Sequence, residues 1–161
     1  FLYAGLMIMA DGTPKVIEYN CRFGDPETQP ILLRLKSDLV AHCLAALDGN
    51  LNSEKADWDA RPSVGIVMAA GGYPGSYAKG EVIDGLTADN IDGEKVFHAG
   101  TAIVDGQVVT NGGRVLCATA MGNTVAEAQQ AAYKLAATVN FKDAYKRTDI
   151  AWRAIEREQK N

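Results

Sequence analysis

The sequence predicts a mixed α+β protein built from two units. Short β-branched and aromatic runs alternate with Gly- and Pro-containing turns, and two helical patterns separate an opening hairpin from a later group of strands. The hydrophobic fraction of 47% and the charged fraction of 22% over 161 residues fit a packed core. We therefore expect the end of one domain at residues 1–50, a polar linker at 51–61, and a small α+β domain at 62–161.

The chain opens with a predicted β-hairpin. Strand-like runs at 2–9 and 15–22 flank Asp11-Gly12-Thr13-Pro14, which is a turn signal. Phe1 is not an initiator methionine, and it falls inside a strand pattern that is already under way. We therefore expect further residues of the same protein before Phe1.

Two helices are predicted next. The helical pattern from Pro26 to about Leu35 has Asp25 at the N-cap and Pro26 at the first helical position. A second helix runs from Asp38 to Leu47 and ends at Gly49.

The second unit begins with strands and ends with helices. Five strands are predicted, at 63–70, 95–100, 102–104, 107–109 and 113–121, with Asp105-Gly106 as a hairpin turn between the third and fourth. Thr124 and Glu127 have the spacing of a capping box and predict a helix to about Val139. An amphipathic helix is predicted at about 150–158.

Composition excludes several classes of protein. A net charge of −4 argues against a general nucleic-acid binder, and no run of about 20 apolar residues predicts a membrane span. The three cysteines, Cys21, Cys43 and Cys117, lack paired spacing, which favours reduced thiols in a cytoplasmic protein.

Residues 16–30, VIEYNCRFGDPETQP, carry more ionisable and amide side chains than a buried strand tolerates. Side chains alternate across a strand, so Glu18, Asn20 and Arg22 share one face. The opposite face is apolar and suits a core: Ile17, Tyr19, Cys21 and Phe23. A carboxylate and an amide oxygen two residues apart are the hard ligands that Mg²⁺ prefers, and a guanidinium grips phosphate. The alternative is an ordinary polar face on a solvent-facing sheet.

A second candidate site lies at Asn111-Gly112-Gly113-Arg114. Two glycines let backbone N–H groups approach an anion, and Arg114 adds positive charge. The alternative is a plain turn with a surface arginine. His98 and Thr101 flank a strand end, where a structural role is favoured over a substrate contact. In the basic tail, a solvated face is favoured over a phosphate site for four residues: Lys142, Lys146, Arg147 and Arg153.

The string RFGDPETQ at 22–29 resembles the signature of the glycinamide ribonucleotide synthetase family, also called phosphoribosylamine–glycine ligase. Other segments are similar to the same family in the same order: YAGLMI, GGYP, HAGT, NGGRVL and YKRTDI. The resemblance covers nearly the whole chain. It implies the C-terminal end of an ATP-grasp core, consisting of the hairpin plus helices, followed by the family's small C-terminal domain.

The resemblance implies a reaction and roles for particular residues. ATP phosphorylates the carboxylate of glycine, and the amine of 5-phosphoribosylamine attacks the glycyl phosphate to form the amide, in purine biosynthesis. Glu18 and Asn20 are implied as ligands of Mg²⁺ (or Mn²⁺), and Arg22 as the cation near the transferring phosphoryl group. Asp25 is implied as an acceptor for the glycine ammonium. The anion at Gly112, Gly113 and Arg114 would be the phosphate of phosphoribosylamine.

Two alternatives and one departure accompany this interpretation. Another ATP-grasp ligase or carboxylase of nucleotide synthesis is disfavoured by the GDPETQ string. A non-catalytic binding or assembly module is the second alternative, because the phosphate-covering loop and adenine pocket of an ATP-grasp enzyme are expected before Phe1. For that reason we expect no turnover from these 161 residues alone. The preceding strand, LYAGLMIM, carries no acid, which leaves the number of metal ions open.

Overall fold

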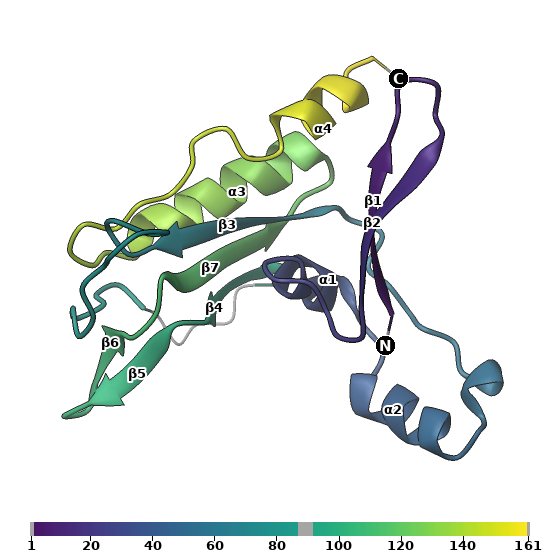
Figure 1. The fold of residues 1–161 in the computed structure, drawn as a ribbon, viewed down its shortest axis with the longest axis horizontal. Coiled ribbons are helices and arrows are strands. Elements are labelled where there is room, and N and C mark those ends of the chain that lie inside the picture. Colours follow the sequence, from purple (N-terminus) through teal and green to yellow (C-terminus); the bar gives the residue numbers. More distant parts are fainter. Residues whose placement is uncertain (1, 87–91, 161) are drawn as a thin grey trace.

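The structure, a computed structural model, describes residues 2–86 and 92–160. Figure 1 shows its elements, which follow in chain order as β1 (Tyr3–Ile8), β2 (Pro14–Asn20), α1 (Thr28–Arg34), α2 (Leu39–Leu47), a 3-10 turn (Leu51–Ser53), β3 (Ser63–Ala69), β4 (Glu94–His98), β5 (Thr101–Val104), β6 (Gln107–Thr110), β7 (Arg114–Met121), α3 (Val125–Thr138) and α4 (Trp152–Glu158). The predicted α+β class is confirmed, and so is the order of its helices and strands.

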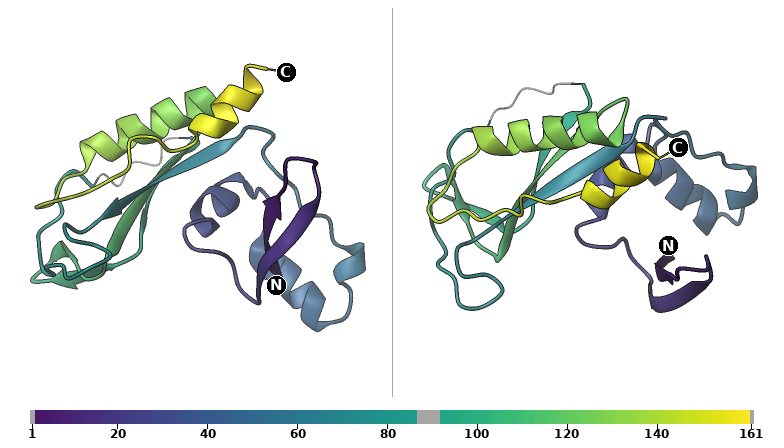
Figure 2. Two further views of the ribbon diagram at one scale, coloured as in Figure 1. Left: turned by 45° about the horizontal axis from the view of Figure 1, so that its top comes forward. Right: turned by 90° about the horizontal axis from the view of Figure 1, so that it is seen from above.

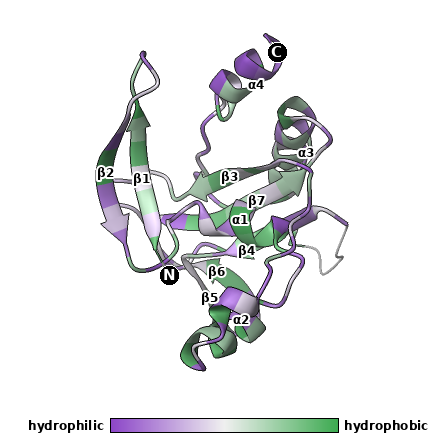
Figure 3. Cartoon of the chain, turned by 90° about the vertical axis from the view of Figure 1, so that its right-hand side faces the viewer, coloured by the Kyte–Doolittle hydropathy of each residue, from purple (hydrophilic) through white to green (hydrophobic). Residues whose placement is uncertain are grey.

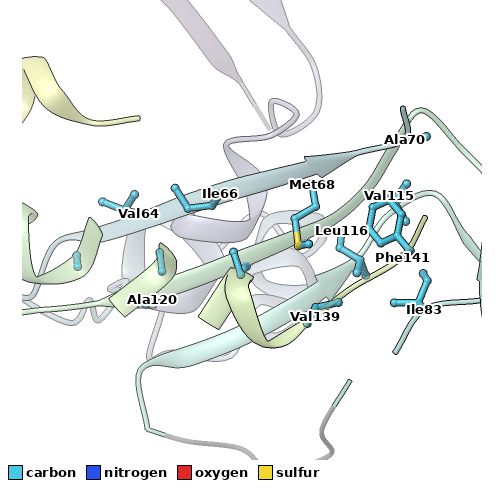
Figure 4. Close-up of a cluster of buried hydrophobic side chains, with 14 residues drawn as sticks. Val64, Ile66, Met68, Ala70, Ile83, Val115, Leu116, Ala120, Val139 and Phe141 are labelled. Atoms are coloured by element: carbon cyan, nitrogen blue, oxygen red, sulfur yellow. The ribbon is translucent and has the colours of Figure 1, made fainter. Parts of the chain in front are cut away.

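The centre of the fold is an antiparallel sheet of three strands in the order β3-β7-β4. Helix α3 lies across one face of this sheet (Figure 1). Its Ala128, Ala132 and Ala136 recur every fourth residue and are fully buried, because they form one stripe of the helix. They meet alternate residues of β3 and β7 in a single apolar cluster, whose largest members include Ile66 and Met68 (Figure 4).

Helix α1 packs on the opposite face of the same sheet, against β3 and β7 (Figure 1). Gly65 lies at this contact. A Cβ atom at Gly65 would lie 3.0 Å from Cys117 Sγ and 3.6 Å from Pro30 Cδ. The Ser63 hydroxyl also donates a hydrogen bond of 2.7 Å to the Pro30 carbonyl. Helix α1 therefore ties the first third of the chain to the sheet.

The β1–β2 hairpin stands apart from the sheet (Figure 2). Its strands pair in antiparallel fashion, from Tyr3 with Asn20 to Ile8 with Pro14. The apolar face predicted to lie in a core is instead exposed, with Ile17 at 63% and Tyr19 at 62%. The reason is that the main contacts of β1 and β2, within the described ranges, are with each other. Figure 3 shows apolar residues on both strands of this uncovered hairpin.

The predicted helix caps have different outcomes. The Thr124 cap is confirmed, because its hydroxyl accepts the Glu127 N–H at 3.1 Å at the start of α3. Asp38 was predicted as the first residue of the second helix, but it is the N-cap of α2, where its Oδ1 accepts the Val40 N–H at 2.7 Å. The prediction of Asp25 as N-cap was wrong. Helix α1 begins at Thr28 with Glu27 as its N-cap residue, and residues 25–27 form a turn instead. The Asp25 carboxylate is engaged elsewhere, as described below.

Candidate functional site

A cavity of about 880 Å³ opens between the hairpin and the turn that precedes α1. It is lined by backbone and side chains of β1, by the end of β2, and by residues 22–28. Four of the predicted site residues line it: Glu18, Arg22, Asp25 and Arg114. The first three come from the opening motif, and the fourth comes from the start of β7. Folding thus brings the two candidate motifs of the sequence to one place.

Glu18 and Asn20 lie on one face of β2 and contact each other. The Asn20 amide nitrogen donates a hydrogen bond of 3.1 Å to Glu18 Oε1. Gly5 pairs with Glu18 across the hairpin, and a Cβ there would lie 3.2 Å from Glu18 Cγ, so the glycine leaves room for the Glu18 side chain. A cation shared by these two side chains needs the amide to turn, so that its oxygen faces the carboxylate.

Arg22 lies just beyond the strand. Because β2 ends at Asn20, the guanidinium projects from the bend that follows and not from the strand itself. It is exposed, and its Nη1 donates a hydrogen bond of 3.0 Å to the carbonyl of Phe23. A guanidinium carries five N–H donors, so this single bond to the backbone orients the fork and leaves capacity for an anion in the cavity.

Asp25 and Arg114 form an ion pair across the cavity wall. Arg114 Nη2 lies 2.9 Å from Asp25 Oδ2, and the two side chains are 41% and 55% exposed. The sequence assigned these residues to different ligands, one to an ammonium and the other to a phosphate. In the structure each is the other's partner, so the charges of the two motifs neutralise each other in part.

A β-bulge explains why Arg114 reaches this cavity. Met68 of β3 pairs with Leu116 of β7, and the next residue, Ala69, pairs with Arg114. Val115 therefore has no partner in β3 and is the extra residue of a bulge between these two strands. Val115 and Leu116 both belong to the buried cluster under α3 (Figure 4). Because Val115 and Leu116 both face the cluster, the residue before them, Arg114, lies on the opposite face of β7, where it lines the cavity.

Gly112 and Gly113 are needed for packing. A Cβ atom at Gly113 would collide with the ring of Tyr73, and one at Gly112 would lie 2.9 Å from the Gly100 Cα. The Gly113 carbonyl accepts the Ala70 N–H at 2.8 Å. These close approaches account for both glycines without an anion, and neither residue lines the cavity that holds Arg114.

Tyr3 and Glu27 are cavity residues that the sequence did not single out. Both line the cavity, and both approach Gly24, where a Cβ would touch the Glu27 carboxylate and lie 3.2 Å from the Tyr3 ring. Partial burial raises the pKa of the Tyr3 phenol, and the negative charges of Glu27 and Glu18 raise it further. The phenol therefore stays protonated at neutral pH. In the sequence, a glycine at position 24, between Arg22 and Asp25, was the signal that could have indicated this close approach.

The remaining candidate residues lie away from the cavity. His98 Nδ1 is 3.1 Å from the Thr101 hydroxyl, which satisfies the predicted structural role. His42 connects α2 to the segment that follows it. Its Nδ1 lies 3.1 Å from Glu54 Oε2, and its Nε2 lies 2.8 Å from the Ser37 hydroxyl.

The donor set limits what kind of metal could bind. Within residues 2–86 and 92–160, no three His, Cys, Asp or Glu side chains lie close enough together to hold a metal ion. Glu18 and Asn20 therefore offer two ligating side chains, one carboxylate and one amide. That number fits Mg²⁺, which is usually held by one or two side chains together with substrate phosphates. No described helix is long and apolar enough to cross a bilayer.

Two segments of the chain match known protein families. Residues 63–153 match the family described as "Phosphoribosylglycinamide synthetase, C domain", and residues 1–28 match "Phosphoribosylglycinamide synthetase, ATP-grasp (A) domain". The chain belongs to the phosphoribosylglycinamide synthetase family.

Proteins named phosphoribosylamine--glycine ligase are similar over nearly the whole chain. A phosphoribosylamine--glycine ligase of Vibrio parahaemolyticus is 65% identical over 159 residues, and that of Escherichia coli K12 is 64% identical over 160 residues. Each match covers 99% of this chain and 37% of the relative. The crystal structure of the Thermotoga maritima phosphoribosylamine--glycine ligase has a TM-score of 0.70 at 38% identity, covering 92% of this chain and 36% of that one. The chain thus spans a little over a third of the length of these relatives.

Proposed function

We propose that this chain forms the C-terminal part of an ATP-dependent ligase that joins glycine to 5-phosphoribosylamine. The observation that carries the proposal is the convergence of Glu18, Arg22, Asp25 and Arg114 on one cavity. The family match and the names of the relatives support it. Because the chain spans 37% of the relatives' length, the activity belongs to the longer enzyme, and these residues supply one wall of its site.

The chemistry proposed for this wall is charge control during phosphoryl and acyl transfer. The glycine carboxylate takes the terminal phosphoryl group of ATP, which leaves as ADP. The amine of phosphoribosylamine then attacks the acyl carbon, loses a proton, and displaces inorganic phosphate. Negative charge accumulates on phosphoryl oxygens in both steps, and preorganised cations stabilise it. Arg22 supplies a fork of N–H donors for these oxygens.

Glu18 and Asn20 would hold the divalent cation, Mg²⁺ or Mn²⁺, which neutralises phosphate charge when it is bound. Asp25 would accept the ammonium group of glycine. Arg114 is a positioning residue in this scheme, because its 2.9 Å contact fixes the Asp25 carboxylate at the cavity wall. Gly112 and Gly113 are not needed as a phosphate site in this proposal, because their close approach to Gly100 and to the Tyr73 ring accounts for both glycines.

Domain limits and location complete the proposal. We propose that residues 1–50 end the ATP-grasp core, that 51–61 form a linker, and that 62–161 form the C-terminal domain. The three free cysteines support a cytoplasmic location, because thiols stay reduced there.

A chimera tests the proposed function. The 161 residues replace the matching part of the Escherichia coli relative, which is 64% identical over this stretch. We expect the chimera to form ADP and phosphate only when ATP, glycine and phosphoribosylamine are all present. A chimera that folds, binds ATP and forms no amide would contradict the proposal.

A further inference from the structure

A second cavity of about 500 Å³ lies on the face of the central sheet that α3 does not cover. Its floor consists of Gly65, Val67 and Ala69, the residues of β3 that point away from the α3 core. Arg114 lines both cavities, so it separates the second cavity from the one that holds Glu18 and Arg22. A molecule seated in the second cavity therefore has one end beside the proposed reaction centre.

The walls of the second cavity carry positive charge only. Arg114, Lys146 and Arg147 line it, and no Asp or Glu does, although the chain as a whole is acidic. Two of these cations already have carboxylate partners outside the cavity. Arg114 pairs with Asp25, and Arg147 donates two hydrogen bonds of 2.8 and 2.7 Å to Asp149.

Lys146 differs from its two neighbours. It is half-buried, and among the described residues its ammonium has no ion-pair or hydrogen-bond partner. Burying a charge without a partner is costly, so an unpaired lysine in a partly apolar cavity favours an anionic ligand. Lys142, in the same basic tail, lies 3.9 Å from Glu81 and is 70% exposed, as expected for a solvated surface lysine.

The backbone around Lys146 is fixed in place. Tyr145 exchanges two backbone hydrogen bonds with Ala69, of 2.8 and 2.9 Å, so this segment continues the edge of the sheet. On the other side of Lys146, the Tyr133 hydroxyl of α3 donates to the Arg147 carbonyl at 2.8 Å and accepts the Ile150 N–H at 3.1 Å. Lys146 is thus held between two anchored residues, which reduces the entropy lost when it binds a ligand.

We propose that the second cavity binds the sugar phosphate portion of phosphoribosylamine, with Lys146 contacting its phosphate. This inference rests on the proposed function and gives that substrate a place. A phosphate monoester carries the charge that the cavity lacks, and the apolar floor of β3 accommodates the sugar ring. The amine, at the far end of the sugar from the phosphate, then points past Arg114 toward the first cavity. Glycine is too small to span both cavities.

Direct binding tests the inference on the 161-residue chain. The probes are ribose 5-phosphate, which lacks the reactive amine, and ribose, which also lacks the phosphate, with affinity measured by calorimetry. We expect ribose 5-phosphate to bind and ribose not to bind. Lys146→Met should weaken the binding of ribose 5-phosphate about tenfold or more, because a charged hydrogen bond is lost. Lys142→Met is the matched control and should bind like the unchanged chain. Equal affinity in both variants would overturn the proposal, once their unfolding midpoints show that both are folded.

The chimera separates this inference from the proposed function. In an active chimera, Lys146→Met should raise KM for phosphoribosylamine about tenfold or more and leave KM for ATP and glycine unchanged. An active chimera in which Lys146→Met leaves all three KM values unchanged overturns the inference and leaves the proposed function intact. A parent chimera that folds and binds ATP but is inactive contradicts the proposed function, and the binding of ribose 5-phosphate then still decides whether the cavity recognises a sugar phosphate.

Discussion

Arg114 Nη2 lies 2.9 Å from Asp25 Oδ2, although the two residues are 89 positions apart in the chain. The pair connects the turn before α1 to the start of β7, and so it joins the two motifs that the sequence marked for function. Both side chains are about half-exposed. Exposed ion pairs contribute little to the free energy of unfolding, so the main role of this one is to position the Asp25 carboxylate at the cavity wall.

The first prediction concerns how much the Asp25–Arg114 ion pair contributes to the free energy of unfolding. A double-mutant cycle of Asp25→Asn and Arg114→Gln should give a coupling of about 0.2–1 kcal/mol in the free energy of unfolding, the range for exposed pairs. Urea unfolding of the chain and its three variants measures it. A coupling of about 3 kcal/mol would show instead that the pair holds the fold together.

The second prediction separates Glu18 from Arg22 in the chimera. Glu18→Gln keeps the shape of the side chain and removes its charge, so it should raise the magnesium requirement and be partly rescued by excess metal. Arg22→Lys keeps a charge and loses the planar fork, so kcat should fall about a hundredfold with no rescue. A magnesium titration at saturating ATP and glycine measures both. Rescue of Arg22→Lys alone would reverse the two roles.

The third prediction concerns the 161 residues by themselves. They should show no ATP-dependent ligation of glycine, because one wall of a site supplies neither full positioning nor full charge neutralisation. Phosphate release with all three substrates measures this. Turnover of about 1 per second, an ordinary enzyme rate, would mean that the whole active site lies within this chain.

The fourth prediction tests the packing role of Gly113. Gly113→Ala should destabilise the chain by about 1–3 kcal/mol, since the added methyl group collides with the Tyr73 ring in a closely packed turn. The thermal unfolding midpoint measures the loss. In a Tyr73→Ala background the same substitution should cost much less. If its cost is unchanged there, the glycine is needed for some reason other than the ring.

The fifth prediction concerns acid stability. The Arg61 side chain and its backbone N–H hold the pKa of the Asp59 carboxyl well below its usual range. The unfolded chain therefore takes up a proton at this residue at a higher pH than the folded chain. The contribution of Asp59 to stability should be complete above about pH 4 and should decline as the pH falls below that value. The stability difference between the chain and Asp59→Asn, measured by urea unfolding from pH 7 to pH 2, should shrink accordingly. A difference that is constant across this range would contradict the assignment.

Local patterns in the sequence predict most of the fold. The Asp11–Pro14 turn, the Asp105-Gly106 turn and the Thr124 cap are each determined by a few adjacent residues, and all three are confirmed. Asp25 was misjudged because its side chain has two competing partners. The nearby helix N-terminus is visible in sequence, whereas Arg114 is visible only once the chain is folded.

The candidate site shows the same limit. The alternation of Glu18 and Asn20 follows from strand geometry alone, and their side chains do meet. Tyr3 could not be found in this way, because its environment of two carboxylates appears only in the folded chain. Lys146 was considered together with the other basic residues of the tail, and only the folded chain distinguishes it, by placing it in a cavity without carboxylates. The exposed hairpin face likewise depends on which elements are available to cover it, and strand periodicity carries no information about that.

Because Val115 is an extra residue in β7 relative to β3, the candidate site depends on the number of residues in this strand. Sides of a strand alternate as even and odd numbers do, so one extra residue exchanges the sides for everything that precedes it. Deleting Val115 would leave a regularly paired strand in which every remaining side chain is unchanged. It would nevertheless turn Arg114 toward the α3 core. Asp25 would lose its partner, and both cavities would lose a shared wall. At this position, the number of residues matters as much as their identity.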